Sequence, residues 1–172
     1  MKTLITSAAL LCCALLFVSV AGADEMPFTL TGQGLDAAGT FYGAPIADGQ
    51  WLVSDASGLF NGSNIVGIWP ESNTGNIFSF DNLFFASGPF VDGGGIVFKL
   101  DNGDMVNLCF DTGCAGAAET YTAIVWDPVT GITNLNADSA EFGAPTPEPS
   151  TLMLLGSGLA GLARLGRRAL AT

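Results

Sequence analysis

Histidine is absent from all 172 residues of the chain. Without it, the Ser-His-Asp and Cys-His nucleophile systems cannot form, and the usual zinc centres lose a principal ligand. A phosphate-binding loop is missing too, because the glycines at 93–95 lead into a strand-like segment rather than opening a helix. The sequence therefore predicts a protein that is not an enzyme and needs no cofactor.

Positive charge is also scarce, with five basic residues against 16 acidic ones. Between Asp24 and Ala144 lie fifteen of the acids but only one base, Lys99, so this region carries a net charge near −14. Nucleic acids and anionic lipid surfaces are repelled by such a domain and are excluded as its partners. One interpretation of the acidity is solubility, because copies with the same charge repel one another. The functional alternative is capture of cations such as calcium.

The periodicity of a long amphipathic helix is missing from the middle of the chain. Short segments rich in β-branched and aromatic residues alternate with clusters of Gly, Asn, Asp and Pro, which is typical of strands joined by turns. We expect an all-β domain over 24–140, an antiparallel β-sandwich or open barrel resembling a jelly roll. The expected strands are 27–32, 50–53, 64–69, 76–80, 96–100, 105–110 and 121–126, and a final edge strand is expected from about 134 that fades into a linker.

The clearest turn signal is Asp101-Asn102-Gly103-Asp104, between two apolar strand segments. Asn-Gly tolerates the positive φ of a type I′ turn, so we expect a hairpin here.

A secretory signal peptide is predicted over residues 1–23. Met1-Lys2 gives a short charged start, an apolar run follows, and Ala21-Gly22-Ala23 is a small-residue cleavage site before Asp24. We expect export through the Sec translocon and removal of the segment by signal peptidase. Cys12 and Cys13 are lost with it.

Two cysteines remain after this cleavage, Cys109 and Cys114. A close pair in an exported protein predicts a disulfide that pins a short loop. A metal site is the alternative, although two thiols without histidine make a poor ligand set.

The C-terminal end begins with a linker over 141–149, kept extended by Pro147 and Pro149. An apolar segment with a basic end follows, and we expect a transmembrane helix with its stop over 150–168. The arginines at 164, 167 and 168 should stay cytoplasmic, which places the acidic domain in the periplasm. The basic residues of this stop are Arg164, Arg167 and Arg168.

Pro147-Glu148-Pro149-Ser150, the apolar helix and the terminal arginines together resemble the PEP-CTERM sorting signal of exported Gram-negative proteins. The resemblance covers about 25 residues and departs from the pattern only in the tail Ala169-Leu170-Ala171-Thr172. It implies recognition by exosortase, cleavage near Pro-Glu-Pro, and a transient stay in the inner membrane before release to the cell surface or outside. A permanent single-pass anchor is the alternative.

The function expected from these features is structural or adhesive, at the cell surface or in an exopolysaccharide matrix or biofilm. A module that binds carbohydrate or calcium is the alternative, with sugar contacts at Trp51, Trp69 and Trp126 and calcium contacts at Asp101 and Asp104. A third hypothesis is a glycoside hydrolase that uses paired carboxylates. Its candidate carboxylates are Asp81, Asp92, Asp101 and Asp104. Most of these aspartates lie beside Gly or Asn, where Asp is a turn former.

Overall fold

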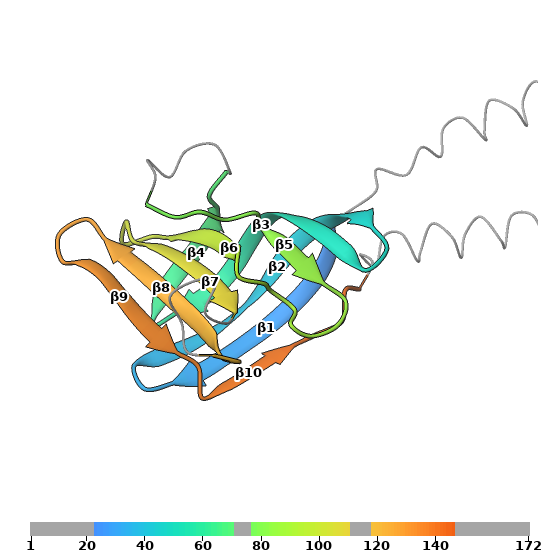
Figure 1. Cartoon of the computed structure of the whole chain (residues 1–172). Coiled ribbons are helices and arrows are strands. Elements are labelled where there is room, and N and C mark those ends of the chain that lie inside the picture. The colour runs from blue at the N-terminus through green and yellow to red at the C-terminus, as the bar shows by residue number, and fades with distance from the viewer. Residues whose placement is uncertain (1–22, 71–76, 111–117, 147–172) are drawn as a thin grey trace, which may run out of the picture. The chain divides into compact units, whose positions relative to one another are not determined.

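The computed structural model describes residues 23–70, 77–110 and 118–146, which belong to one unit, Ala23–Thr146. Within these residues, ten strands form a single antiparallel sheet (Figure 1). The strands are β1 (Asp24–Gly32), β2 (Leu35–Ala47), β3 (Gln50–Phe60), β4 (Ser63–Ile68), β5 (Leu83–Phe85), β6 (Ile96–Leu100), β7 (Met105–Phe110), β8 (Tyr121–Asp127), β9 (Gly131–Asn136) and β10 (Ser139–Phe142).

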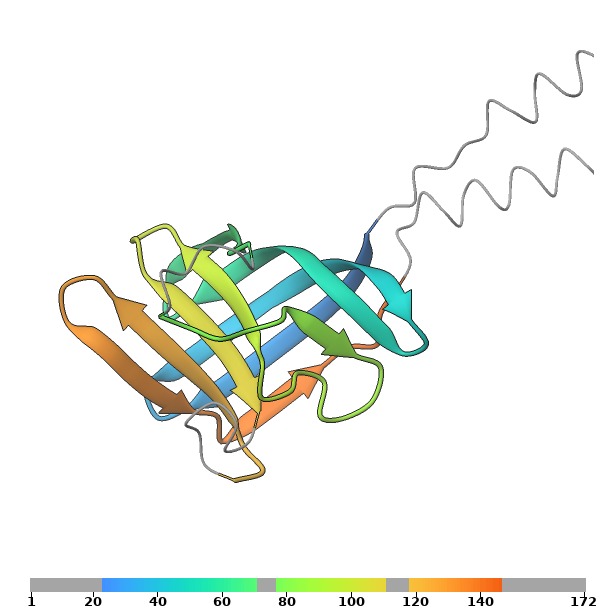
Figure 2. The same cartoon turned by 45° about the horizontal axis from the view of Figure 1, so that its top comes forward.

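The sheet is curled into a half-barrel, and its two ends are joined by a corner in the chain. The strand order is β10-β1-β2-β3-β4-β6-β7-β8-β9, with β5 paired to β3. Although β9 and β10 are consecutive in sequence, they lie at opposite ends of this order, and only residues 137 and 138 join them. At the corner, Ala137 N donates to Tyr121 O (2.9 Å) at the start of β8, and Asp138 N donates to Thr31 O (2.8 Å) in β1. The hydrogen bonds of the chain therefore change from β8 to β1 between these two residues (Figure 2).

The expectation of an all-β antiparallel fold is confirmed, and the curled sheet is the form it takes. The hairpin at 101–104 is also confirmed, since it joins β6 to β7. The predicted type I′ turn was wrong, because among residues 101–104 only Gly103 has a positive φ, of 96°. Leu100 N and O instead bond to Asp104 O and Gly103 N, which makes a three-residue loop with a left-handed glycine.

The strand predictions failed in two opposite ways. The longest strand, β2, was not expected because its Ala- and Gly-rich sequence has few β-branched residues. Residues 77–80 were expected in a strand but pair with none. Phe78 from this segment packs against Cys109 and Ile124, on the outer face of the sheet. Its apolar residues therefore cover a second face rather than extend the sheet.

The main core lies on the concave face of the half-barrel. Alternate residues of β1 point inward, so that Met26, Phe28 and Leu30 are buried between exposed neighbours. Phe28 stacks on Phe41 of β2 with ring centroids 4.3 Å apart, and Phe98 of β6 packs against both rings. This aromatic cluster holds β1 and β2 against the opposite wall of the half-barrel.

The stacked rings require a close approach of β2 and β3 beneath them. Gly39 faces Gly58 across these strands. A Cβ on Gly39 would lie within 3.0 Å of the Phe28 ring, and Gly58 has a φ of +138°. Only glycine fits both positions, which explains why a residue unfavourable to strands occurs inside each.

A second aromatic cluster closes the end where β8 begins. Phe84, Phe90 and Phe142 pack with Tyr121, whose ring centroid is 4.8 Å from that of Phe142. The Tyr121 hydroxyl accepts a hydrogen bond from Phe90 N at 2.8 Å. Burial raises the pKa of this phenol above its usual value, because the ionised form would lose its hydration.

Asn82 is a buried polar residue that joins three strands. Its backbone oxygen accepts from Val53 N (2.9 Å) on β3, and its Nδ2 donates to Trp69 O (3.1 Å) at the end of β4. Val97 N of β6 donates to its Oδ1 at 2.9 Å. Asn82 is 4% exposed and has a left-handed backbone, with φ of 56°. Asparagine tolerates this conformation better than most residues.

We expect Asn82→Ala to lower the free energy of unfolding by about 3 kcal/mol or more, since it leaves two buried backbone groups unpaired and strains a left-handed residue. Urea denaturation measures this loss. Asn61→Ala is the matched control, because Asn61 has a φ of 48° but makes its side-chain bonds at the exposed surface. Equal losses in the two variants would contradict the role of the buried amide.

Candidate functional site

The two ends of the domain meet in one antiparallel bridge. Glu25 N donates to Thr146 O, and Thr146 N donates to Glu25 O, both at 3.0 Å. Gly143 N adds a bond to Pro27 O at 2.8 Å. We call this pairing of residues 143–146 with the start of β1 the terminal clasp. It places the last described residue, Thr146, beside the predicted start of the mature chain.

The terminal clasp includes part of the predicted linker. Residues 141 and 142 belong to β10, and residues as far as Thr146 are bonded to β1, so the predicted linker of 141–149 begins inside the fold. The sorting motif Pro147-Glu148-Pro149-Ser150 follows at once and lies outside the described residues. The motif therefore starts one residue after the last bridge of the sheet.

Trp51 anchors the other end of the same region. Its Nε1 donates to Asp24 Oδ2 at 2.7 Å, and its ring packs against the core. Asp24 is the residue that the predicted signal cleavage, after Ala23, would make the new N-terminus. Trp51 was expected as a sugar contact, but the structure uses its indole N–H to hold the first residue of β1.

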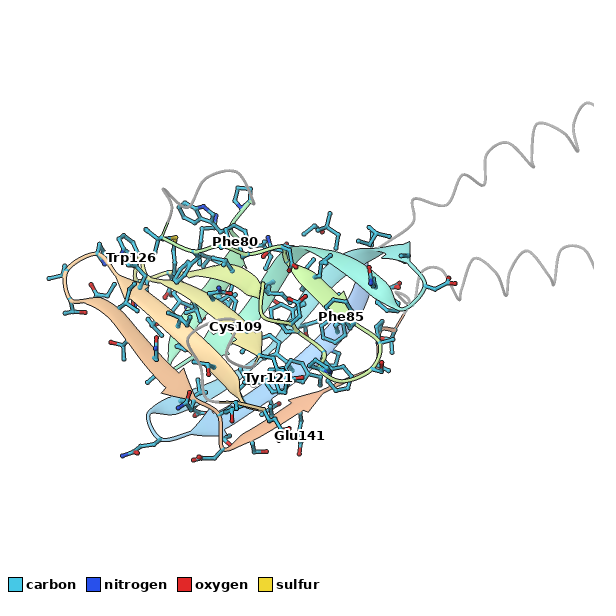
Figure 3. All side chains as sticks on the ribbon, viewed as in Figure 1. Phe80, Phe85, Cys109, Tyr121, Trp126 and Glu141 are labelled. Carbon is cyan, nitrogen blue, oxygen red and sulfur yellow. The ribbon has the colours of Figure 1, made fainter. Side chains whose placement is uncertain are left out.

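Trp69 and Trp126 lie together on the outer face of the sheet. Ile68 and Phe98 point into the core. Trp69 and Lys99 follow them in the sequence and therefore face outward. Trp126, which pairs with Met105 of β7, faces outward as well. Lys99 Nζ lies 5.8 Å from the centroid of the Trp69 ring, within range of a cation–π contact. Figure 3 labels Trp126 at the end of β8. We call Trp69, Lys99, Met105 and Trp126 the outer aromatic face.

All three tryptophans are half-buried rather than laid flat on the surface. Trp51 lies on a separate part of the domain from the outer aromatic face. The indole Nε1 of Trp69 is buried and has no hydrogen-bond partner.

The two aspartates expected to contact calcium lie in the β6–β7 turn and are engaged there. The Asp101 carboxylate accepts from the backbone and side-chain nitrogens of Asn64, and the Asp104 carboxylate accepts from Asn102 Nδ2 at 2.8 Å. Within the described residues, no cluster of three or more His, Cys, Asp or Glu side chains could hold a metal ion. These carboxylates serve the hairpin and its contact with β4.

Asp104 also lines a cleft of about 280 Å³ at the open side of the half-barrel. Asp127, across the cleft, accepts from Val129 N, Thr130 N and Thr130 Oγ1, and these bonds lower the pKa of its carboxyl group. Both carboxylates are therefore committed to turns. The other lining residues are Phe60, Asn61, Ser63, Leu100, Asn102, Val125, Thr130, Gly131, Thr133 and Leu135.

A second hollow, of about 410 Å³, was not foreseen. It lies between the β2–β3 turn and the loop after β5, and Asp48, Gln50, Pro89 and Asp92 help to line it. The Asp92 carboxylate accepts from Gly94 N and Gly95 N, so it too stabilises its own loop. No sequence pattern links these positions, because the hollow depends on the pairing of β3 with β5.

Several predicted site residues lie outside the described part of the chain. They are Ala21 of the signal site, Cys114, the sorting motif and the basic stop Arg164, Arg167 and Arg168. Cys109 is buried in β7, and its disulfide with Cys114 stays a prediction. Among the described residues there is no helix of the length and apolarity needed to cross a bilayer. The helix predicted over 150–168 is not among them.

Comparison with known proteins gives one match. Residues 145–168 match the family model of the PEP-CTERM protein-sorting motif. No curated protein and no solved structure matches the chain. The motif is thus identified, and these comparisons transfer no activity to the half-barrel domain.

Replacing Asp24 by Ala should lower the free energy of unfolding of the mature protein by about 1 kcal/mol, because a charge-assisted but partly exposed bond to Trp51 is lost. The measurement is urea denaturation of Asp24→Ala, Trp51→Phe and the double variant. Because both single variants lose the same bond, we expect the double variant to lose less unfolding free energy than the sum of the two single losses. Strictly additive losses would contradict the coupling, and Asp36→Ala, on the exposed β1–β2 hairpin, is the control.

Proposed function

We propose that the half-barrel domain is a non-catalytic structural or adhesive module of the cell surface or extracellular matrix, on the premise that residues 145–168 carry a PEP-CTERM protein-sorting motif and make the chain an exported substrate of exosortase. The motif supplies the export and the processing partner. The finer role of the domain is the proposal. A polysaccharide or biofilm matrix is the setting we propose for it.

The observation that carries the proposal is the terminal clasp. It pairs Thr146, the last described residue, with Glu25, and the Pro-Glu-Pro element follows directly. All ten described strands lie before residue 147, so the described sheet is formed without a residue of the Pro-Glu-Pro element. Cleavage near Pro147 would therefore release the domain with its sheet intact.

Two further features support a non-catalytic role. The chain has no histidine, and the carboxylates of Asp101, Asp104 and Asp127 are each bound within or beside a turn. A catalytic acid needs a carboxyl group whose pKa is raised, whereas the pKa of Asp127 is lowered. No observation favours the glycoside hydrolase hypothesis or a calcium site.

Carbohydrate binding is the second candidate, and the outer aromatic face favours it. Trp69 and Trp126 are partly exposed on the same face, and Lys99 adds the one positive charge between residues 24 and 144. This combination suits a sugar ring that carries an acidic group.

The sorting proposal is tested by Glu148→Ala and Pro149→Ala, expressed in a host that contains an exosortase. We expect both variants to keep their C-terminal segment and stay in the membrane fraction, because the enzyme would lose its recognition element. Intact mass and fractionation measure this outcome. Glu141→Ala, a charge removal on exposed β10, should be processed normally. Normal release of the motif variants would contradict the proposal.

The carbohydrate candidate predicts that Trp69→Ala and Trp126→Ala each weaken binding to an acidic polysaccharide by about tenfold, the equivalent of about 1.4 kcal/mol. Val66→Ala, on the exposed outer face of β4, should leave binding unchanged. Glycan-array binding with and without calcium measures the effect. Absence of sugar binding by the wild-type protein would leave the structural role as the sole candidate.

A further inference from the structure

The terminal clasp and the sorting motif share two residues. The match to the PEP-CTERM protein-sorting motif covers residues 145–168, so it begins inside the clasp rather than after it. Thr146 is one of the shared residues, and its backbone N–H and C=O are both bonded to Glu25 at 3.0 Å. A backbone N–H that donates within a sheet is not available to a second protein. Pairing with β1 and recognition by a processing enzyme are therefore competing states of these residues.

The clasp is separated from β10 by a change of register. β10 lies along β1 in continuous register, and Gly143 N still bonds to Pro27 O just beyond its end (Figures 1 and 2). Between this bond and the bridge at Thr146, β1 has one residue and the clasp has two. Such an extra residue is a β-bulge, which disrupts the ladder. The second of the two is Pro145, which has no N–H to donate. The clasp is thus a short pairing of its own that can open while β10 stays in place.

Burial also divides the clasp from the strand before it. The Phe142 ring, at the end of β10, packs against Phe84, Phe90 and Tyr121. None of residues 143–146 is buried. Regions with few buried apolar contacts and solvent-accessible hydrogen bonds open more easily than the core. Opening should therefore stop at the Phe142 ring and free about 13 Å of extended chain, at about 3.3 Å for each residue.

We propose that the terminal clasp is a gate on processing, which must open before exosortase can cleave near Pro147. The proposal rests on the proposed function, in which residues 145–168 are the sorting signal of an exosortase substrate. With the clasp closed, Thr146 is held against β1, one residue before the Pro-Glu-Pro element. With the clasp open, the shared residues become available to the enzyme, and residues 143–146 separate the sheet from the cleavage segment.

The gate makes a kinetic prediction. When opening and closing are fast relative to cleavage, the rate of cleavage follows the population of the open form. A change that stabilises the closed clasp should therefore slow processing, and a change that opens the clasp should accelerate it. Neither change needs to touch the Pro-Glu-Pro element.

A disulfide across the bridge tests the closed state. In an antiparallel pair that exchanges both hydrogen bonds, the Cα atoms lie about 5.5 Å apart, which suits a disulfide. In a host that contains an exosortase, we expect oxidised Glu25→Cys/Thr146→Cys to be processed at least about tenfold more slowly than the wild type. Thr146→Cys alone is the matched control, because it makes the same change beside the motif but cannot lock the clasp. Reduction should bring the double variant to the rate of this control, as measured by pulse labelling and intact mass.

Gly143→Ala tests the open state. A Cβ at this position would lie 2.5 Å from Cγ and 2.9 Å from Cδ of Pro27, so the substitution pushes the clasp away from β1. We expect processing to be about threefold faster or more. Adding Pro27→Ala, which removes both clashing atoms, should return the rate to that of the wild type. Because Pro27 lies far from the motif in the sequence, such a rescue cannot come from recognition of the motif. Pro27→Ala alone is the control.

The outcomes separate the gate from the function on which it rests. Equal rates for the locked and reduced forms, or an unchanged rate in folded Gly143→Ala, would overturn the gate while Glu148→Ala, if uncleaved, still supports sorting by exosortase. A wild-type chain that is never processed would overturn both. Should Gly143→Ala fail to fold, the disulfide comparison decides alone. A cysteine pair that does not oxidise in the folded domain would contradict the bridge of Glu25 with Thr146 and the gate with it.

Discussion

The half-barrel depends on a single buried amide. Asn82 bonds to β3, to the end of β4 and to β6, at the place where the pairing of β4 with β6 loses its register between Ile65 and Ile68. Backbone ladders alone do not hold the sheet together there. A side chain with both a donor and an acceptor, on a backbone that can adopt positive φ, supplies the missing bonds. Through these bonds Asn82 holds the backbone of Trp69 beside that of Val97.

Local chemistry was predictable from the sequence, and long-range pairing was not. The β6–β7 hairpin was found because alternating apolar residues flank Asn102-Gly103, and the sorting motif was found because its parts are contiguous. β2 was missed because its strand conformation comes from pairing with β1 and β3 rather than from its Ala- and Gly-rich composition. The role of Asn82 was not predicted, because nothing in Asp81-Asn82-Leu83 indicates a buried amide.

In the candidate sites too, local features could be predicted from the sequence and long-range contacts could not. The three tryptophans could be recognised in strand segments, but their separation into one anchor and one outer pair depends on the register of strands distant in sequence. The terminal clasp joins Glu25 to Thr146, and no local pattern reports such a contact. The aspartates of the β6–β7 turn were rightly weighed as turn formers, since their carboxylates bind Asn64 and Asn102.

The corner between β9 and β10 has a consequence for the timing of folding. β1 is the first described strand of the chain and β10 the last, yet the two must pair. Closing a contact between such distant segments is slow relative to local hairpins. The sheet is therefore completed only when nearly the whole domain, as far as β10, is available to fold, shortly before Pro147 in the chain. Completion of the fold and arrival of the cleavage segment are thereby made almost simultaneous.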